Sequence, residues 1–214
     1  ATRNGQVALW TAPDGTHWSR MDFNLRGFVS EVDEQNRFAA DGSLKSLTIR
    51  GRVPEGDAAE SYEVTGRTYR FKSPVDQGTG EAVPDLAYVA VGGTFDSFIF
   101  LLDKMLKAPD HSVNLLPSGR GSLALLTTLE VSNGSQKKTI TAYAISGFGL
   151  SPIRVWMDGD DFFGFAGFVT TVPEGWEQAG PEMIRAQDAA LAKLAPAQMA
   201  AAAKIPAGPV VFRN

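Results

Sequence analysis

Few side chains in this sequence combine the residue types and the spacing that catalysis requires. The 214 residues contain two histidines, His17 and His111, and no cysteine. A catalytic metal site needs several imidazoles and carboxylates that converge, yet neither a His-x-His nor a His-Glu-x-x-His motif is present. We therefore predict no catalytic residue, no metal ligand and no cofactor, and we expect both histidines in exposed loops.

One acidic turn, Asp158-Gly159-Asp160-Asp161, is superficially similar to a calcium-binding loop. In such a loop the twelfth position carries a bidentate glutamate, but the twelfth residue counted from Asp158 is Val169. The turn is therefore expected to be an ordinary solvated β-turn.

A candidate anion-binding site lies in Pro117-Ser118-Gly119-Arg120-Gly121. The glycines free backbone amides to point toward an anion, and Arg120 adds a positive charge beside Ser118. The lysine and the spacing of a Walker motif are missing. Ser118 and Arg120 are therefore candidates for binding phosphate or carboxylate, with a plain loop as the alternative.

Aromatic residues at alternate positions of predicted strands could line a pocket for an apolar ligand. The candidates are Tyr69, Phe71, Trp156, Phe163 and Phe165. At strand spacing such residues also form ordinary cores, and we expect Trp156 to be mostly buried.

The elements that must position these residues are mainly short strands. Residues 139–168 alternate in three apolar runs separated by Gly/Pro and acidic turns, which predicts an antiparallel meander. Residues 95–107 form a helix whose apolar stripe is wider than one face needs, so we expect the sheet to enclose it. The predicted fold class is α+β: a strongly curved, mainly antiparallel, half-barrel-like sheet that wraps a central helix, followed by a C-terminal helix.

The predicted domain organisation has three parts. Residues 1–178 form the sheet domain, residues 179–204 a C-terminal helical segment, and residues 205–214 a linker and the first strand of a downstream domain.

Three local expectations complete the prediction. Polar residues 29–37 are expected to carry a strand toward an edge or loop, and residues 72–84, with two prolines and two glycines, are expected to form a loop. Pro196 should interrupt the helix that begins at residue 181, leaving a second short helix over residues 197–204.

The segment from residue 139 onward resembles the region upstream of the catalytic barrel in certain large bacterial, often exported, amidohydrolase-superfamily proteins. There a Gly-x-x-x-x-Pro turn, here residues 147–152, leads to a Val-Trp-Met/Leu-Asp strand, here residues 155–158. An aromatic strand, a Gly-Trp segment at residues 175–176 and a helix follow. Residues 208–214 look like the first strand of the small β-sandwich with which amidohydrolases open.

This resemblance implies an N-terminal accessory domain without hydrolytic activity of its own, because that activity belongs to a barrel whose metal ligands do not occur here. The implied partner is a downstream catalytic domain of the same polypeptide, or a homo-oligomer. The curved sheet also looks like the lipoprotein-carrier (LolA/LolB) type of half-barrel. That likeness gives the alternative of a stand-alone periplasmic protein that binds a lipid or another apolar small molecule.

Composition excludes several other classes of protein. The net charge is -4, and Lys and Arg are scattered singly, which argues against nucleic acid as a partner. No apolar run is long enough to span a membrane. The chain starts at Ala1, which is compatible with a cleaved leader or a trimmed sequence, and we expect a soluble periplasmic or secreted protein.

Overall fold

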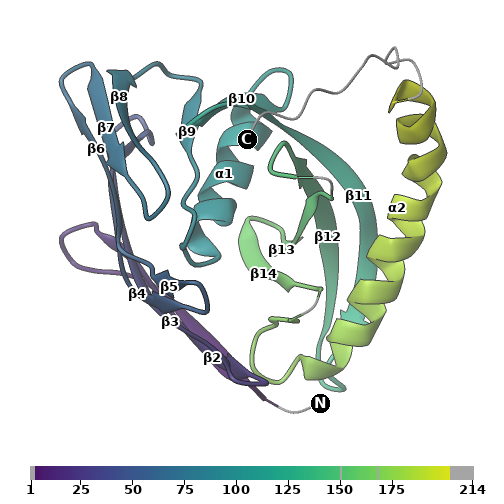
Figure 1. The fold of residues 1–214 in the computed structure, drawn as a ribbon. Helices are drawn as coiled ribbons and strands as arrows, with labels where there is room; N and C mark the ends of the chain where they lie inside the picture. The colour runs from purple at the N-terminus through teal and green to yellow at the C-terminus, as the bar shows by residue number, and fades with distance from the viewer. Residues whose placement is uncertain (1–2, 150, 168, 203–214) are drawn as a thin grey trace. The chain divides into compact units, whose positions relative to one another are not determined.

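The computed structural model describes residues 3–149, 151–167 and 169–202, drawn as a ribbon in Figure 1. These residues form a mainly antiparallel β structure with two sheets and two α-helices, one of them at the C-terminal end. Contacts divide the chain into two compact units. The first unit contains Ala1–Ala124 and Ala144–Val155, and the second contains Leu125–Tyr143 and Trp156–Asn214.

The larger sheet belongs to the first unit, and every pair of neighbouring strands in it is antiparallel. Its order is β1-β2-β3-β4-β6-β7-β8, and β5 pairs with β4. The strands are β1 (Gly5–Thr11), β2 (His17–Leu25), β3 (Phe28–Phe38), β4 (Leu44–Val53), β5 (Gly56–Asp57), β6 (Glu60–Thr65), β7 (Thr68–Lys72) and β8 (Gln77–Glu81). Alternation along them separates a buried, mostly apolar face from an exposed face that is rich in charged side chains.

The expectation of a loop over residues 72–84 is wrong, because β8 lies within it and pairs with β7. Gly78 lies opposite Phe71, and a Cβ atom on Gly78 would stand 2.6 Å from the Phe71 ring. A Cβ atom on Gly80 would stand 2.6 Å from the Tyr69 hydroxyl. The glycines leave room for these aromatic side chains, and their lack of side chains hides the strand from periodicity.

The expectation that residues 29–37 approach an edge is also wrong, because β3 lies between β2 and β4 in the sheet. The chain reverses between β2 and β3 at Arg26 and Gly27, which both have positive φ angles. The polar residues of β3 misled the prediction, since Glu34 and Asn36 are buried polar side chains.

The second sheet has the order β14-β13-β12-β11-β10-β9, so successive strands are neighbours and the predicted meander is confirmed. Its strands are β9 (Leu86–Tyr88), β10 (Ser112–Leu116), β11 (Arg120–Ser132), β12 (Lys137–Ser146), β13 (Ile153–Asp158) and β14 (Asp161–Phe165). The short β9 pairs with β10 in parallel. Strands β11, β12 and β13 each have some residues in the first unit and the others in the second.

The predicted helices are present, with one correction. Helix α1 (Asp96–Lys107) lies beside β10 (Figure 1), close to its expected bounds. After a 3-10 turn, η1 (Glu177–Ala179), helix α2 (Gly180–Ala202) continues through Pro196 without interruption. A proline removes one helical hydrogen bond, and the alanine-rich residues around it favour the helix strongly. Neither described helix has the length and apolarity needed to cross a membrane.

Each unit has its own hydrophobic core. The first includes Met21, Val32, Leu47, Ile49, Tyr62, Phe71 and Tyr88, from the larger sheet and β9. The second includes Val131, Ile140, Trp156, Phe163, Trp176 and Met183, so the start of α2 packs on the strands of its own unit. Trp156 is 0% exposed, which confirms the prediction of its burial. The expected downstream strand, residues 208–214, lies outside the described residues.

Candidate functional site

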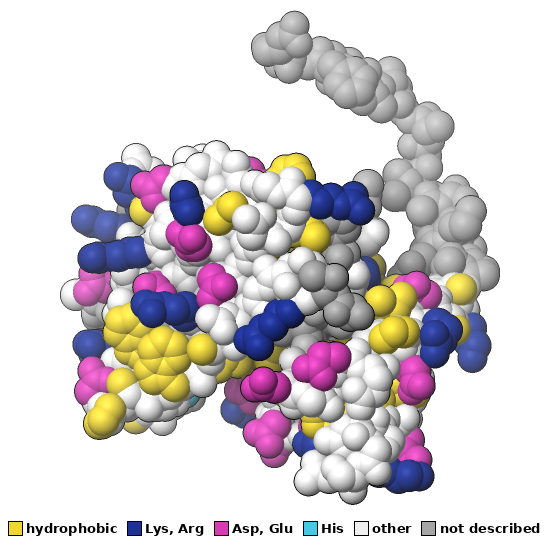
Figure 2. All heavy atoms as spheres, turned by 90° about the horizontal axis from the view of Figure 1, so that it is seen from below, with side chains coloured by type: hydrophobic (Ala, Val, Ile, Leu, Met, Phe, Trp, Pro, Cys, Tyr) yellow, Lys and Arg dark blue, Asp and Glu magenta, His cyan; other side chains and the backbone are white. Residues whose placement is uncertain are grey.

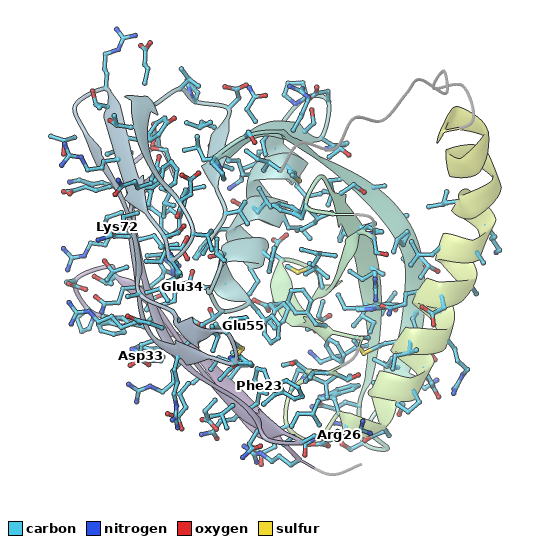
Figure 3. The ribbon with its side chains drawn as sticks, viewed as in Figure 1. Phe23, Arg26, Asp33, Glu34, Glu55 and Lys72 are labelled. Carbon is cyan, nitrogen blue, oxygen red and sulfur yellow. The ribbon has the colours of Figure 1, made fainter. Side chains whose placement is uncertain are left out.

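An acidic side chain is buried on the inner face of β3 in the first unit. Alternation along β3 sends Ser30, Val32, Glu34 and Asn36 to the core side, and each is at most 2% exposed. Asp33, the neighbour of Glu34, points to the opposite face, as Figure 3 shows. A charged residue is almost never fully buried unless it has partners.

Glu34 accepts hydrogen bonds on both carboxylate oxygens. Its Oε2 accepts from the backbone N–H of Thr94 at 2.7 Å and from the Thr94 hydroxyl at 3.0 Å. Its Oε1 accepts from the Ser97 hydroxyl at 2.7 Å and from the Asn36 side-chain amide at 2.8 Å. Four donors from the fold itself therefore satisfy the buried carboxylate.

These bonds attach the beginning of α1 to the sheet. The Thr94 hydroxyl, which donates to Glu34, accepts a bond from the backbone N–H of Asp96 at 3.2 Å. The N-terminus of a helix carries partial positive charge, so a carboxylate is favourable there. Glu34 thus supplies, from a distant strand, a negative charge that is favourable beside the N-terminus of α1.

Asp96 is the second carboxylate of this cluster. It is 6% exposed, and its Oδ2 accepts a bond from the Asn36 amide at 3.1 Å, so Asn36 links the two acids. Burial, and then the nearby charge of Glu34, raise the pKa of Asp96 from 3.8 to about 7, although the bond from Asn36 acts in the opposite direction. Asp96 therefore changes its charge near neutral pH.

The raised pKa of Asp96 makes stability depend on pH. The folded state holds a proton that the unfolded chain has released, so stability should fall as pH rises from about 4 to about 7. We expect wild type to lose on the order of 2 kcal/mol relative to Asp96→Asn between pH 5 and pH 8, since a tenfold change in proton affinity corresponds to about 1.4 kcal/mol. Urea melts of both proteins at both pH values measure this loss. Parallel pH profiles would show that Asp96 is not the group responsible.

A third buried carboxylate, Glu60, holds the segment that precedes α1. It accepts bonds from the Tyr88 hydroxyl at 2.5 Å, from the Val91 backbone N–H at 3.0 Å and from the Gly92 backbone N–H at 3.2 Å. Burial raises the pKa of Glu60, while these bonds oppose the change. Burial and the bond to Glu60 raise the pKa of Tyr88 as well.

These bonds attach one part of the fold to another. The side chains that make them are called the acidic cluster from here on: Glu34, Asn36, Glu60, Tyr88, Thr94, Asp96 and Ser97. Its carboxylates hold residues 91–97 against the larger sheet. Within the described ranges, no group of three or more His, Cys, Asp or Glu residues is placed to hold a metal ion. General acid–base catalysis requires that the group reach its substrate, and Glu34 is 0% exposed.

Two of the predicted ligand-binding residues, Tyr69 and Phe71, belong to an aromatic stack in the first unit. Their ring centroids are 6.4 Å apart, and Tyr62 and Tyr88 extend the stack. Phe71 is 5% exposed and Tyr69 is half-buried. Only Tyr69 of this pair has substantial surface available to a ligand.

The other three predicted ligand-binding residues lie in the second unit. Trp156 is 0% and Phe163 2% exposed, and both belong to the same core cluster. Phe165 is 9% exposed and its ring lies 5.4 Å from that of Phe162. These side chains fill the interior of the unit.

Two depressions on the larger sheet are lined by residues other than the predicted site residues. One of about 480 Å³ is lined mainly by charged residues, and one of about 310 Å³ mainly by polar residues. None of the predicted ligand-binding or anion-binding residues lines either depression.

The candidate anion-binding residues lie where β11 begins. Ser118 is exposed in the turn before the strand, but the Arg120 guanidinium already binds Asp110 at 2.6 Å and the Ser112 hydroxyl at 2.5 Å. An anion would have to compete with the Asp110 carboxylate for Arg120. Anion binding at this turn stays a prediction.

Of the two histidines, His17 lies elsewhere than expected, and His111 does occupy an exposed turn. His17 is the first residue of β2 and is half-buried, so its placement in an exposed loop was wrong. Its ring packs edge-on against Phe38 and Phe100, with centroids 5.2 Å away in each case. In the acidic turn, Asp158 forms an ion pair with Lys138, as suits an ordinary turn between strands.

Sequence reasoning missed the acidic cluster. Glu34 and Asn36 share their parity with the apolar Val32, a signal that they face the core once β3 is recognised as a central strand. No sequence signal connects them to Thr94 and Ser97, about 60 residues away.

Comparisons with known proteins add little to this description. No protein-family model matches the chain, and no curated protein matches it. A crystal structure of a DUF1089 family protein from Pseudomonas aeruginosa is similar over 80% of this chain and 94% of its own, with 14% sequence identity and a TM-score of 0.43. A likeness at that score supports no argument about function.

Proposed function

We propose that this chain is a non-catalytic accessory domain that acts by packing against a partner. The partner is a catalytic, amidohydrolase-like domain that follows it in the same polypeptide. The setting is the periplasm or the exterior of a bacterial cell.

The hydrogen bonds of the acidic cluster are the observation that supports a non-catalytic role. Glu34, Glu60 and Asp96 are the buried acids of this cluster, and all three accept hydrogen bonds from groups of the fold. Their bonds hold the start of α1, a task that a reacting carboxylate could not perform while it exchanges protons with a substrate. The identity of the partner rests on the resemblance of residues 139–214.

The gene provides a direct test of the partner. We expect the reading frame to continue beyond Asn214 into a segment with a His-x-His motif and further metal ligands. A stop codon directly after Asn214 would refute the accessory role. A continuation without those ligands would refute the amidohydrolase-like partner and leave the non-catalytic role standing.

An apolar ligand site is the second candidate, favoured by the half-buried Tyr69 beside the aromatic stack of the first unit. In this alternative the larger sheet is a curved half-barrel around α1, and Tyr69 lies at the mouth of its concave face. A fluorescent apolar dye should then bind, and Tyr69→Ala should weaken binding while Arg70→Ala, on the opposite face of β7, should not. Absence of dye binding to the wild type would rule out this candidate.

A further inference from the structure

The turn that joins β11 to β12 has the sequence Ser132-Asn133-Gly134-Ser135. An asparagine followed by glycine is chemically labile, because glycine has no side chain to keep its backbone nitrogen away from the asparagine side-chain amide. Gly134 has a φ angle of 90°, in the left-handed region that glycine adopts readily. Asn133 is half-buried and the three residues around it are exposed, so water reaches the turn.

The side-chain carbonyl of Asn133 accepts three hydrogen bonds. Its Oδ1 accepts from the Gln136 backbone N–H at 2.8 Å, from the Ser135 hydroxyl at 3.0 Å and from the Ser135 backbone N–H at 3.1 Å. These donors draw electron density from the carbonyl and are placed to stabilise negative charge on its oxygen. The carbonyl carbon is therefore activated toward attack by a nucleophile.

The backbone nitrogen of Gly134 is the atom that can attack this carbon, because it belongs to the next residue along the chain. Its N–H donates to the Ser132 hydroxyl at 3.1 Å. Ser132 is exposed, so its hydroxyl can pass the proton on to water. One turn therefore holds an activated carbonyl, the nitrogen that attacks it and an acceptor for the proton.

We propose that Asn133 is a site of spontaneous deamidation in the folded chain. The Gly134 nitrogen forms a bond to the side-chain carbonyl carbon of Asn133, and the bond from that carbon to Nδ2 breaks. Nδ2 leaves as ammonia, with the proton that the Gly134 nitrogen gives up. The resulting succinimide is opened by water at either carbonyl, which yields aspartate or isoaspartate.

The modification changes the end of the β11–β12 hairpin. Either product adds a negative charge, and isoaspartate also lengthens the backbone by a methylene group. The turn is held by the Gln178 side chain, which donates to the Ser132 carbonyl at 3.0 Å, and Lys137 pairs with Glu130 beside it at 2.9 Å. A longer backbone moves these partners apart, so isoaspartate loosens the hairpin within the second unit.

Incubation of the chain in mildly alkaline buffer, followed by peptide mapping with mass spectrometry, tests the proposal. The map reads Asn133 separately from the other Asn-Gly pair, Asn4-Gly5. Asn133 should become a mixture of aspartate and isoaspartate, about tenfold faster for each unit of pH because the attacking nitrogen must lose its proton. The net charge is -4, and charged side chains of both signs are spread over the face drawn in Figure 2. The added charge should therefore give an acidic form that ion exchange separates. An Asn133 that stays unmodified would overturn the proposal.

Two variants test whether the bonds of the turn promote the reaction. Ser132→Ala removes the proton acceptor and Ser135→Ala removes one donor to Oδ1, so each should slow deamidation of the folded chain at least about fivefold. In urea, where these bonds are absent, wild type and both variants should react at equal rates. Variants that react like wild type when folded, or that are equally slowed in urea, would overturn the role of the turn.

The turn between β3 and β4 provides a matched control. Asp41 Oδ1 accepts from the Ser43 backbone N–H at 2.9 Å and from the Ser43 hydroxyl at 2.6 Å, as in the other turn. The Gly42 N–H, however, donates to the Ala39 carbonyl at 2.9 Å, and a backbone carbonyl does not pass a proton on to water. Asp41→Asn should therefore give an Asn-Gly pair that deamidates more slowly than Asn133 in the same sample. Equal rates would overturn the part assigned to the hydroxyl acceptor.

Discussion

Replacing Trp156 by alanine should lower the free energy of unfolding by about 3–4 kcal/mol. The indole is 0% exposed within the core of the second unit, so its removal leaves a cavity that the surrounding strands cannot close. Its Nε1–H also donates to the Gln187 side chain at 3.1 Å, and Gln187 is itself 1% exposed. The variant therefore loses apolar packing and leaves a buried amide oxygen without this donor. Urea melts measure the loss.

Leu125→Ala is the matched control within the same unit. Leu125 is an apolar strand residue that is 63% exposed, so its truncation should change the free energy of unfolding by less than about 0.5 kcal/mol. If the urea midpoint of Trp156→Ala equals that of wild type, the indole is not a core residue and must be considered again as a ligand contact.

Replacing Glu34 by alanine should cost about 3 kcal/mol, because four donors lose their acceptor in the interior of the first unit. The backbone N–H of Thr94 cannot turn toward another partner, whereas the hydroxyls can partly adapt. We expect the start of α1 to detach from β3 before the rest of the unit unfolds. Hydrogen exchange at the Thr94 amide should therefore become much faster than in wild type.

Glu31→Ala separates this effect from the loss of a carboxylate on β3. Glu31 lies on the same strand but points to the wet face, where it pairs with Arg52 at 3.0 Å. Exposed ion pairs contribute little, so this variant should lose less than about 1 kcal/mol. Equal losses in Glu31→Ala and Glu34→Ala would contradict the role assigned to the acidic cluster.

Local patterns in the sequence account well for the meander and for α1. Residues 139–168 alternate over three strands with clear turns, and the apolar spacing of residues 95–107 matches the observed helix. Those signals depend on side-chain periodicity, which neighbouring residues determine. The burial of Trp156 followed from the same reasoning, because its strand lies within the sheet with neighbours on both sides.

Predictions from the sequence failed where the alternation of apolar and polar side chains does not match the observed structure. In β8 the glycines make room for Phe71 and Tyr69, so the strand has no apolar side chains at alternate positions to mark it. In β3 the polar residues Glu34 and Asn36 face the core, and their partners become visible only when β3 meets the start of α1. Helix α2 continues through Pro196 although an interior proline costs about 3 kcal/mol, and the alanine-rich residues around it favour the helix.

The acidic cluster is the part of the molecule most easily mistaken for a catalytic site. Asp96 has a pKa of about 7, as a general acid or base would require. Burial beside a second carboxylate produces the same pKa in a purely structural network, and the bonds of Glu34 to Thr94 and Ser97 favour that interpretation.

The most direct test of the non-catalytic role is an amide-hydrolysis assay on this chain alone, with zinc supplied, comparing wild type with Asp96→Asn. The account predicts that the rate of amide hydrolysis with either protein equals the rate in buffer alone. A wild-type rate above the buffer that disappears in Asp96→Asn would show that the cluster performs chemistry, and would contradict the account.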